Sequence, residues 1–376
     1  MDAAARTGAE VLSSQGSEIY VAPRHAAYRD WEMKNPLHLA QGMAEHMLVG
    51  PAPDNARAVT RAIAACQPNL VVSSFTNLGA MLAAEAQGAQ FDVLIPNVYP
   101  MPAQGMPPMG TGLAPARGAL GRIRDDFLNR VSTLTLSRYV LPKLNNLRAE
   151  YGLAPLNTHW SQIHRARKEL ILTSSHFDFP ASLPSTARYV GPILDDPAWA
   201  DADEWVPPPG NAPLVLVSMS STFQNQLSVL QRICDALSGL PLRALVTTGP
   251  ALDPARLSAA GNVSVVRAAP HRAVLDHASL VITHGGHGTV VKALSAGVPL
   301  VVIQHGRDQA DNAMRVTARG AGLSISRRSS RTRIRKAVEH ALRSNSMNAS
   351  AVRLGTRIRE SAGANLIREL EDLPVT

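Results

Sequence analysis

Short apolar runs alternate with helical segments through the second half of the sequence. One run, residues 213–219 (PLVLVSM), is apolar at nearly every position and bounded by Pro and Ser, which is typical of a strand buried on both faces. Strand and helix in turn, joined by short Gly/Pro turns, predict a parallel, doubly wound α/β sheet. Further strands are expected at 242–246, 262–266, 279–283 and 299–303, and helices at 224–237, 272–276, 289–296 and 309–319.

The first half of the sequence is less regular but contains elements of the same kinds. Residues 101–116 are rich in Pro, Met and Gly, which predicts a loop, and the acidic, proline-rich residues 195–210 are the best domain boundary. Strands are expected at 68–73, 91–96 and 169–173, and helices at 78–86 and 131–151. The predicted organisation is a first domain over 1–200, a linker over 201–212, a second domain over 213–355 and a final segment over 356–376 with a closing helix at 361–373.

Composition excludes several other classes of protein. With 376 residues, of which 45% are hydrophobic and 18% charged, the chain suits two folded domains and not a disordered segment. No apolar run approaches the roughly 18 residues of a membrane span, and the first residues lack the pattern of a signal peptide, so we expect a cytoplasmic protein. The two cysteines, Cys66 and Cys234, are too few for a disulfide scaffold and are expected to be small core residues on helices.

The net charge of +8 invites a nucleic-acid function, which the rest of the composition does not support. Aromatic residues are only 4% of the chain, so no stacking platform for bases is expected, and no nucleic-acid partner is predicted. One dense basic cluster is expected to be a solvated loop and the first turn of a helix, although it could touch a phosphate or an acidic membrane surface. It consists of Arg327, Arg328, Arg331, Arg333, Arg335 and Lys336.

The stretch 284–312 (HGGHGTVVKALSAGVPLVVIQHGRDQADN) contains the pattern that indicates a site. Its glycines follow a predicted strand directly and precede a predicted helix, so their backbone amides can approach a phosphate at the positive end of the helix dipole. His284 and Thr289 can add hydrogen bonds to phosphate oxygens. Asp308 and Gln309 follow the next strand, at the edge where ligands of open α/β sheets bind, and their side chains suit sugar hydroxyls.

These residues resemble a known family. The series HGGxGT, AGVP and DQADNAMRV is similar to the donor-binding signature of the GT-B glycosyltransferases of the UDP-glucuronosyl/UDP-glucosyltransferase type, especially bacterial members that glycosylate natural products. The resemblance is clearest over residues 217–322. It implies two Rossmann-like domains that face each other across a cleft, with the donor bound by the second and the acceptor by the first. The implied reaction moves a sugar from a UDP- or dTDP-sugar to a hydroxyl of an apolar small molecule, with inversion.

The resemblance also implies roles for individual residues. The donor diphosphate would be held by His284, Gly285, Gly286, Gly288 and Thr289, together with the small polar loop Ser220, Ser221 and Thr222. Asp308 and Gln309 would bind the transferred sugar, and the nucleotide base would lie at Ala269 and His271. The chain departs from the family at Ala268, where some members have an aromatic residue, and at Lys292, where a glutamate often binds the ribose. The family needs no metal ion or cofactor, so the nucleotide sugar is the expected cosubstrate.

Other motifs have weaker interpretations. His284 and His287 could suggest a metal, but two histidines without a third ligand do not favour one. Asp201 and Asp203 form a D-x-D motif inside the acidic linker, where a solvated spacer is expected. The glycines of residues 110–112 begin a dinucleotide fingerprint that the sequence does not complete. Residues 173–180 (TSSHFDFP) are expected to form a structural turn, with a pocket-lining role for His176 and Asp178 as the alternative.

A general base is the missing part of the expected mechanism. Inverting transfer needs a base for the acceptor hydroxyl, which in the family is a histidine after the first strand of the N-terminal domain. Residues 3–21 resemble a later part of that domain, so the domain is expected to be incomplete at its start. His25, His38 and His46 are the nearest candidates, and none has the family's context. The alternative is therefore a nucleotide-sugar-binding protein without catalysis. Residues 101–109 are expected to help line an acceptor pocket.

Overall fold

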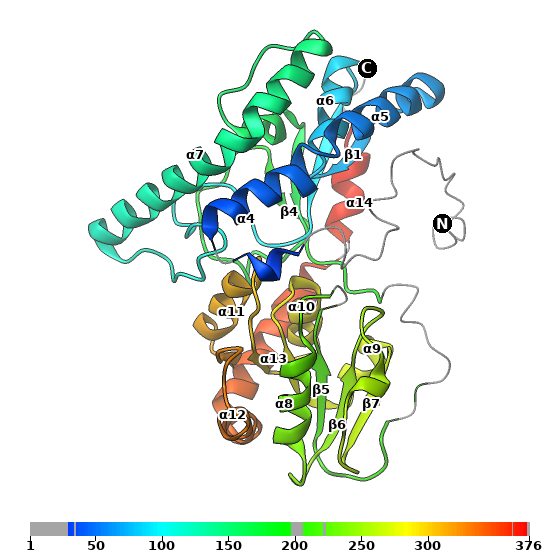
Figure 1. Ribbon diagram of the computed structural model, residues 1–376, viewed down its shortest axis with the longest axis vertical. Helices are drawn as coiled ribbons and strands as arrows, with labels where there is room; N and C mark the ends of the chain where they lie inside the picture. The colour runs from blue at the N-terminus through cyan, green and yellow to red at the C-terminus, as the bar shows by residue number, and fades with distance from the viewer. Residues whose placement is uncertain are drawn as a thin grey trace.

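Six parallel strands form the sheet of the C-terminal domain in the computed structural model, which describes residues 29–33, 35–196, 205, 207–220, 223–362 and 364–373. The spatial order is β10-β9-β8-β5-β6-β7 (Figure 1). Counted from the first strand of the domain, this is 6-5-4-1-2-3, the doubly wound order of a dinucleotide-binding fold. The strands are β5 (Leu214–Ser218), β6 (Arg243–Thr247), β7 (Val263–Val266), β8 (Ala278–Thr283), β9 (Leu300–Val302) and β10 (Gly322–Ser324).

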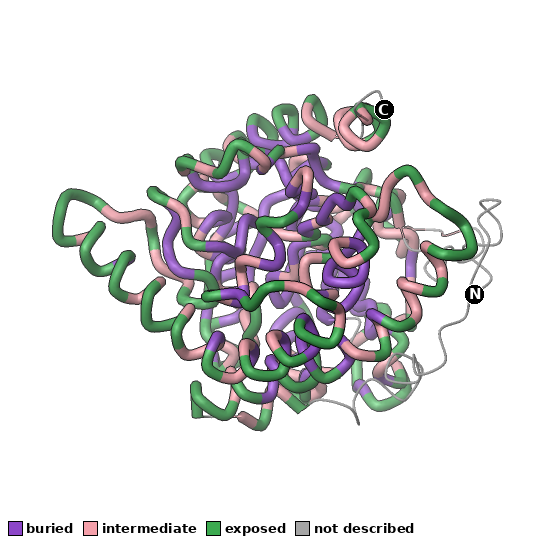
Figure 2. The backbone as a smooth tube through the Cα atoms, turned by 90° about the horizontal axis from the view of Figure 1, so that it is seen from above, coloured by how far each residue is buried: buried purple, intermediate pink, exposed green. Residues whose placement is uncertain are grey.

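Helices cover both faces of this sheet. Val215 and Val217 of β5 contact one core and Leu214 and Leu216 contact the other, which explains why β5 is apolar on consecutive positions. The first core includes α8 (Leu227–Leu237) and α12 (Arg331–Arg343). The second includes α9 (His271–Leu275), α10 (His287–Ser295), α11 (Gln309–Ala318) and α13 (Asn345–Glu360). Figure 2 shows the buried segments gathered in the middle of the molecule.

The N-terminal sheet has four parallel strands among the described residues, in the order β1-β2-β3-β4. One face is covered by α6 and by the second half of α7, whose Val140 and Leu144 are fully buried. The strands are β1 (Val71–Ser74), β2 (Phe91–Ile95), β3 (Lys168–Ile171) and β4 (Ala187–Tyr189). The helices are η1 (Asp30–Glu32), α4 (Pro36–Met43), which continues as the π-helical η2 (Ala44–Leu48), α5 (Ala52–Cys66), α6 (Leu78–Ala86), α7 (Gly118–Glu150) and η3 (His159–Arg165).

The last helix returns to the N-terminal domain. In α14 (Ala364–Glu371), Leu366 and Leu370 pack against Leu170 of β3 on the face of the sheet away from α6. Lys168 fixes this helix by ion pairs to Glu369 (2.9 Å) and Asp372 (2.8 Å). Because α13 continues to Glu360, the second domain extends beyond residue 355, where the sequence placed its end.

The sequence located eight strands within a few residues and missed two. β4 (ARY) and β10 (GLS) are short and contain no apolar run, whereas the equally short β9 (LVV) lies within one. Several helices also differ from expectation: α4, α5 and α13 were not predicted, and α7 begins at Gly118 instead of at residue 131. Cys234 is buried on α8 as expected, but Cys66 is exposed at the end of α5, so its assignment to the core was wrong. Within the described residues, no helix is both long enough and apolar enough to cross a membrane.

Buried polar contacts join the two domains. Asp178, after β3, accepts a hydrogen bond from Nε of Arg315 on α11 (2.7 Å) and others from the Tyr99 amide (3.2 Å) and the Tyr189 hydroxyl (3.0 Å). Thr173 Oγ1 lies 2.9 Å from Nε2 of His287 at the start of α10. Residues 173–180 therefore form a structural junction, in agreement with the first of their two interpretations.

The loop before α7 is attached to the C-terminal domain by a second junction. Asp311 of α11 accepts hydrogen bonds from the backbone amides of Gly110 (2.6 Å) and Gly112 (2.9 Å). Gly112 has a φ of +62°, and a Cβ there would lie 2.9 Å from the Cβ of Ala310. These two glycines hold the loop against α11.

Candidate donor-binding pocket

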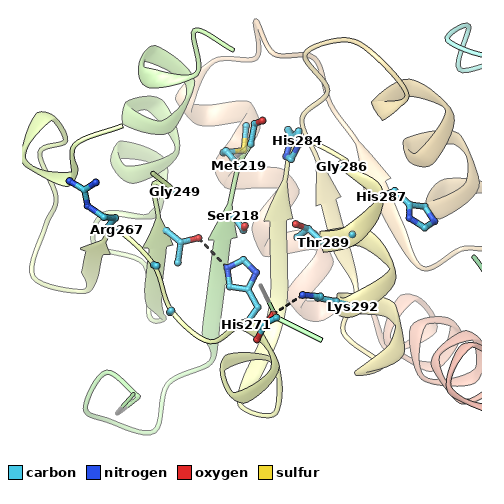
Figure 3. Close-up of a pocket in the computed structure, with 16 residues that line it drawn as sticks. Ser218, Met219, Gly249, Arg267, His271, His284, Gly286, His287, Thr289 and Lys292 are labelled. Atoms are coloured by element: carbon cyan, nitrogen blue, oxygen red, sulfur yellow. Dashed lines mark hydrogen bonds and ion pairs between the residues drawn. The ribbon is translucent and has the colours of Figure 1, made fainter. Parts of the chain in front are cut away.

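A cavity of about 300 Å³ opens at the carboxyl ends of three neighbouring strands of the C-terminal sheet (Figure 3). Ser218 and Met219 line it at the end of β5, Thr247 at the end of β6, and His284 after β8. This edge is where open α/β sheets bind ligands, because the loops after parallel strands diverge there. The remaining lining residues are Asp196, Ser220, Gly249, Arg267, Ala268, Ala269, His271, Gly286, His287, Gly288, Thr289 and Lys292.

The three glycines after β8 differ in what a Cβ at each position would contact. Gly285 has a φ of +97°, and a Cβ there would lie 2.8 Å from Val302 Cγ1, so this glycine makes the turn and is not in the pocket lining. A Cβ at Gly286 would meet the ring of His284 at 2.6 Å. At Gly288 a Cβ would meet nothing within 4 Å, which leaves open space in the first turn of α10. The first turn of α10 thus presents backbone amides and the Thr289 side chain to the cavity.

His284 is neutral at neutral pH. Burial lowers its pKa to about 3, and the charges of His305 and Arg307 act in the same direction, while a hydrogen bond with the backbone of Ser218 opposes them. A neutral imidazole carries one N–H donor and one acceptor nitrogen. His284 can therefore make a directional hydrogen bond to an anionic oxygen without bringing a positive charge into the buried site.

His287 does not combine with His284. Figure 3 shows its ring directed away from the other labelled side chains of the pocket, and its Nε2 lies 2.9 Å from Thr173 Oγ1 of the other domain. Burial lowers the pKa of His287 to about 4. No group of three or more potential metal-ligating side chains was found among the described residues.

An ion pair occupies the corner of the pocket near the end of α10. Lys292 Nζ lies 2.7 Å from Asp196 Oδ1, and the amide of Arg272 donates to the other carboxylate oxygen at 2.9 Å. Burial alone would raise the pKa of Asp196, but these two donors together lower it below its ordinary value. The carboxylate at this corner comes from the segment between the domains, and sequence reasoning missed it because 96 positions separate Asp196 from Lys292.

The predicted base region also lines the pocket. Ala268, Ala269 and His271 follow β7, and Nε2 of His271 lies 3.3 Å from Thr247 Oγ1. Burial lowers the pKa of His271, so this ring is neutral as well. Ser220, which follows β5, lines the same pocket, whereas Ser221 and Thr222 lie outside the described residues.

Asp308 and Gln309 lie beside the glycine turn and not in the cavity lining. Gln309 Oε1 accepts hydrogen bonds from the amides of His305 (2.7 Å) and Gly306 (3.2 Å), and its Nε2 donates to Gln224 (3.0 Å). Asp308 accepts from Nδ2 of Asn312 (2.9 Å), which also donates to the carbonyl of Gly285. Burial raises the pKa of Asp308. Both side chains are thus held by neighbouring residues at the N-terminal end of α11.

The candidate bases and the acceptor loop are placed in the N-terminal domain. His38 is exposed on α4 and His46 is exposed on η2, while His25, like Asp201 and Asp203, lies outside the described residues. Met101 and Met106 are buried in the core of the N-terminal domain, and Met109 is partly exposed. The buried methionines anchor the loop, so only part of the segment 101–109 remains available to a ligand.

Solved structures share this architecture. The calicheamicin glycosyltransferase CalG4 superposes with a TM-score of 0.73 at 22% identity, covering 98% of this chain and 87% of that chain. The glycosyltransferase SnogD from Streptomyces nogalater gives a TM-score of 0.67 at 19% identity, covering 99% of this chain and 89% of that chain. At these identities the likeness shows the fold, which is GT-B with two Rossmann-like domains.

Sequence comparisons show the family. The chain is 28% identical to 4'-demethylrebeccamycin synthase of Lentzea aerocolonigenes over 319 residues, which are 82% of this chain and 74% of that protein. It is 28% identical to UDP-glucuronosyltransferase 3A1 of Mus musculus over 68% of this chain, but the match spans only 52% of the mouse protein. The family model for UDP-glucoronosyl and UDP-glucosyl transferase matches residues 127–361, more than half of the chain. The chain therefore belongs to this family of nucleotide-sugar glycosyltransferases.

Proposed function

We propose that this protein transfers a sugar from a UDP- or dTDP-sugar to a hydroxyl group of an apolar small molecule, with inversion at the anomeric carbon. The observation that carries the proposal is the set of donors at the start of α10. His284, the open turn at Gly288 and the hydroxyl of Thr289 converge on one cavity at the positive end of a helix dipole. N–H and O–H donors suit the oxygens of a diphosphate, so no metal ion is required there.

The nucleoside would occupy the rest of the same cavity. Its base would lie over Ala269 and His271, and its ribose would reach the corner at Asp196. The Asp196 carboxylate would take the place of the glutamate that often binds the ribose in the family, where this chain has Lys292. The transferred sugar would extend towards Asp308 and Gln309. A relative named 4'-demethylrebeccamycin synthase and a neighbour named for calicheamicin support a small natural product as acceptor.

The proposed reaction is a direct displacement at the anomeric carbon. The acceptor oxygen forms a bond to the anomeric carbon while the bond from that carbon to the diphosphate breaks, and the nucleoside diphosphate leaves with the electron pair. Negative charge grows on the diphosphate, where the donors at the start of α10 stabilise it. The acceptor proton goes to a base on the opposite side of the sugar, and the N-terminal domain is the expected source of that base.

His284→Ala tests the diphosphate site. A hydrogen bond to a charged group contributes roughly 1.5–3 kcal/mol, so we expect UDP and dTDP to bind about tenfold to a hundredfold more weakly by titration calorimetry. His340→Ala, which removes an exposed histidine of α12, is the matched control and should leave affinity unchanged. Unchanged affinity of the His284 variant would contradict the proposed diphosphate site. Tight binding by the native chain without hydrolysis or transfer would instead favour a nucleotide-sugar-binding protein.

Lys292→Met tests the corner formed with Asp196. Without its ammonium partner the Asp196 carboxylate is an uncompensated negative charge near the diphosphate, and we expect about tenfold weaker nucleotide binding. The double variant Lys292→Met, Asp196→Asn removes both charges and should recover only part of that loss, because it also removes the carboxylate proposed to bind the ribose. Calorimetry on the two single variants and the double variant gives the coupling; additive losses would show that the pair does not act as a unit.

A further inference from the structure

The first half of α7 exposes a continuous apolar stripe. Its five members are between 44% and 84% exposed, although each is a large hydrophobic residue: Leu120, Ile123, Phe127, Val131 and Leu134. Between Gly118 and Ser137, the only buried residues are Asp125 and Ser137 itself. Figure 1 shows the start of this helix projecting from the N-terminal domain.

The spacing of the stripe places it on one side of the helix. Successive members are three, four, four and three positions apart, which at 100° per residue keeps them within one face about 20 Å long. The second half of α7 buries Val140, Leu144 and Leu147 in the domain core. Those positions lie roughly 120° around the helix from the stripe. The stripe therefore does not continue the face that holds α7 in the domain, and packing of the fold does not explain it.

Arginines border the stripe on both sides. By helical position Arg124 follows one edge and Arg130 the other, while Arg138 continues the stripe beyond Leu134; all three are exposed. The acidic residues of this half balance these charges only in part, and the excess positive charge lies at Arg130 and Arg138. Asp125 is buried and pairs with Arg124 at 2.7 Å, which leaves Asp126 as the exposed carboxylate. The projecting half of α7 is thus an apolar face with a basic margin.

Charge complementarity decides which occupant this face fits. Two copies of the chain that met along the stripe would bring two helix halves of net positive charge together, which is unfavourable. A bilayer with anionic headgroups accepts apolar side chains at the acyl boundary and attracts the flanking arginines, without needing a complementary groove. We propose that the first half of α7 docks the protein on an anionic lipid surface, with Phe127 at the centre of the contact.

Vesicle co-sedimentation of the full chain tests this docking. We expect binding to vesicles of phosphatidylcholine mixed with phosphatidylglycerol, much weaker binding to phosphatidylcholine alone, and release by salt. Phe127→Ser should lower the partition coefficient about tenfold, because it removes the largest apolar group of the stripe. Arg130→Gln should lower it severalfold and reduce the salt dependence. Ile367→Ser, at a site of similar exposure on α14 (61% against 64%), is the matched control and should bind like the native chain.

Three further measurements test whether a second copy of the chain, and not a lipid surface, covers the stripe. The native chain and the Phe127 variant should have the same mass by light scattering, the same circular dichroism spectrum and the same affinity for UDP. Failure to bind anionic vesicles, or equal binding by the native chain and Phe127→Ser, would overturn the proposal. A native dimer that Phe127→Ser converts to a monomer would also overturn it and assign the stripe to a second copy.

Discussion

Arg315→Ala is expected to destabilise the protein by about 3–5 kcal/mol, because it leaves a buried carboxylate without its cation. Arg315 is 2% exposed and Asp178 is fully buried. Both Nε and Nη2 of the guanidinium lie 2.7 Å from Asp178 Oδ1, and its Cζ lies 4.4 Å from the centre of the Phe179 ring. In the variant, Asp178 keeps neutral donors from Tyr99 and Tyr189, but the cation in contact with its carboxylate is lost, because Arg319 donates to the Asp178 backbone carbonyl and not to the carboxylate.

Urea denaturation followed by circular dichroism measures this loss. Arg335→Ala is the control, because its pair with Glu339 is partly exposed and has a separation of 3.8 Å, so a loss below about 1 kcal/mol is expected. Asp178→Asn combined with Arg315→Met removes both charges and should cost less than the sum of the single changes. Since the pair joins the two domains, unfolding of Arg315→Ala should separate into two transitions. A single transition with a loss near that of the control would contradict this account of the junction.

The junction illustrates what the sequence could not predict. The strands were found because each is a short apolar run buried on both sides, as in β5, and this signal is local. The partners of Asp178 are not local: Arg315 is 137 positions away, and nothing near residue 178 indicates it. The same applies to Asp311, whose partners Gly110 and Gly112 lie about 200 positions earlier. The glycines of residues 110–112 looked like an incomplete motif because the group they serve is in the other domain.

The first half of α7 was missed for a different physical reason. Helix prediction relies on an apolar face that periodically meets a core, and here the apolar face meets solvent while the buried face holds little more than Asp125. The candidate site was easier, because a strand, a glycine turn and a helix follow one another within about ten residues. Ser220, Ala269, His271, His284, Gly286, Gly288 and Thr289 were named from the sequence, and all of them line one cavity. Asp196 was not named, because only the fold brings it to Lys292.

Acidification from pH 7.5 to pH 5 is expected to remove several kcal/mol of stability, more than any single substitution considered above. Burial lowers the pKa of His159, His287 and His305 to about 4 and that of His284 to about 3, against 6.5 in the unfolded chain. At pH 5 the unfolded chain therefore holds protons on four histidines that the native protein does not. Each contributes roughly 2 kcal/mol over this interval, which together approaches the whole stability of an ordinary domain.

The direction in which stability changes with pH follows from the number of protons that each state binds. Because the unfolded state binds more protons between about pH 4 and 6.5, the free energy of unfolding rises with pH in that window and is fully retained above it. Asp308 and Asp311 act in the opposite direction, since burial raises their pKa values and the native state binds their protons first. These two carboxyl groups reduce the acid sensitivity, and the histidines outnumber them.

Urea midpoints at a series of pH values between 5 and 7.5 measure the slope, and His159→Gln isolates one histidine. His159 is suitable because it does not line the donor pocket. Its Nδ1 lies 2.8 Å from the hydroxyl of Ser137 on α7. The variant is expected to be less stable than the native chain at pH 7.5 but to lose less stability on acidification. Its slope of the free energy of unfolding against pH should be lower by the equivalent of about one proton. Equal slopes for the two proteins would show that His159 is protonated in the native state, and a flat native profile would show the same for all four rings.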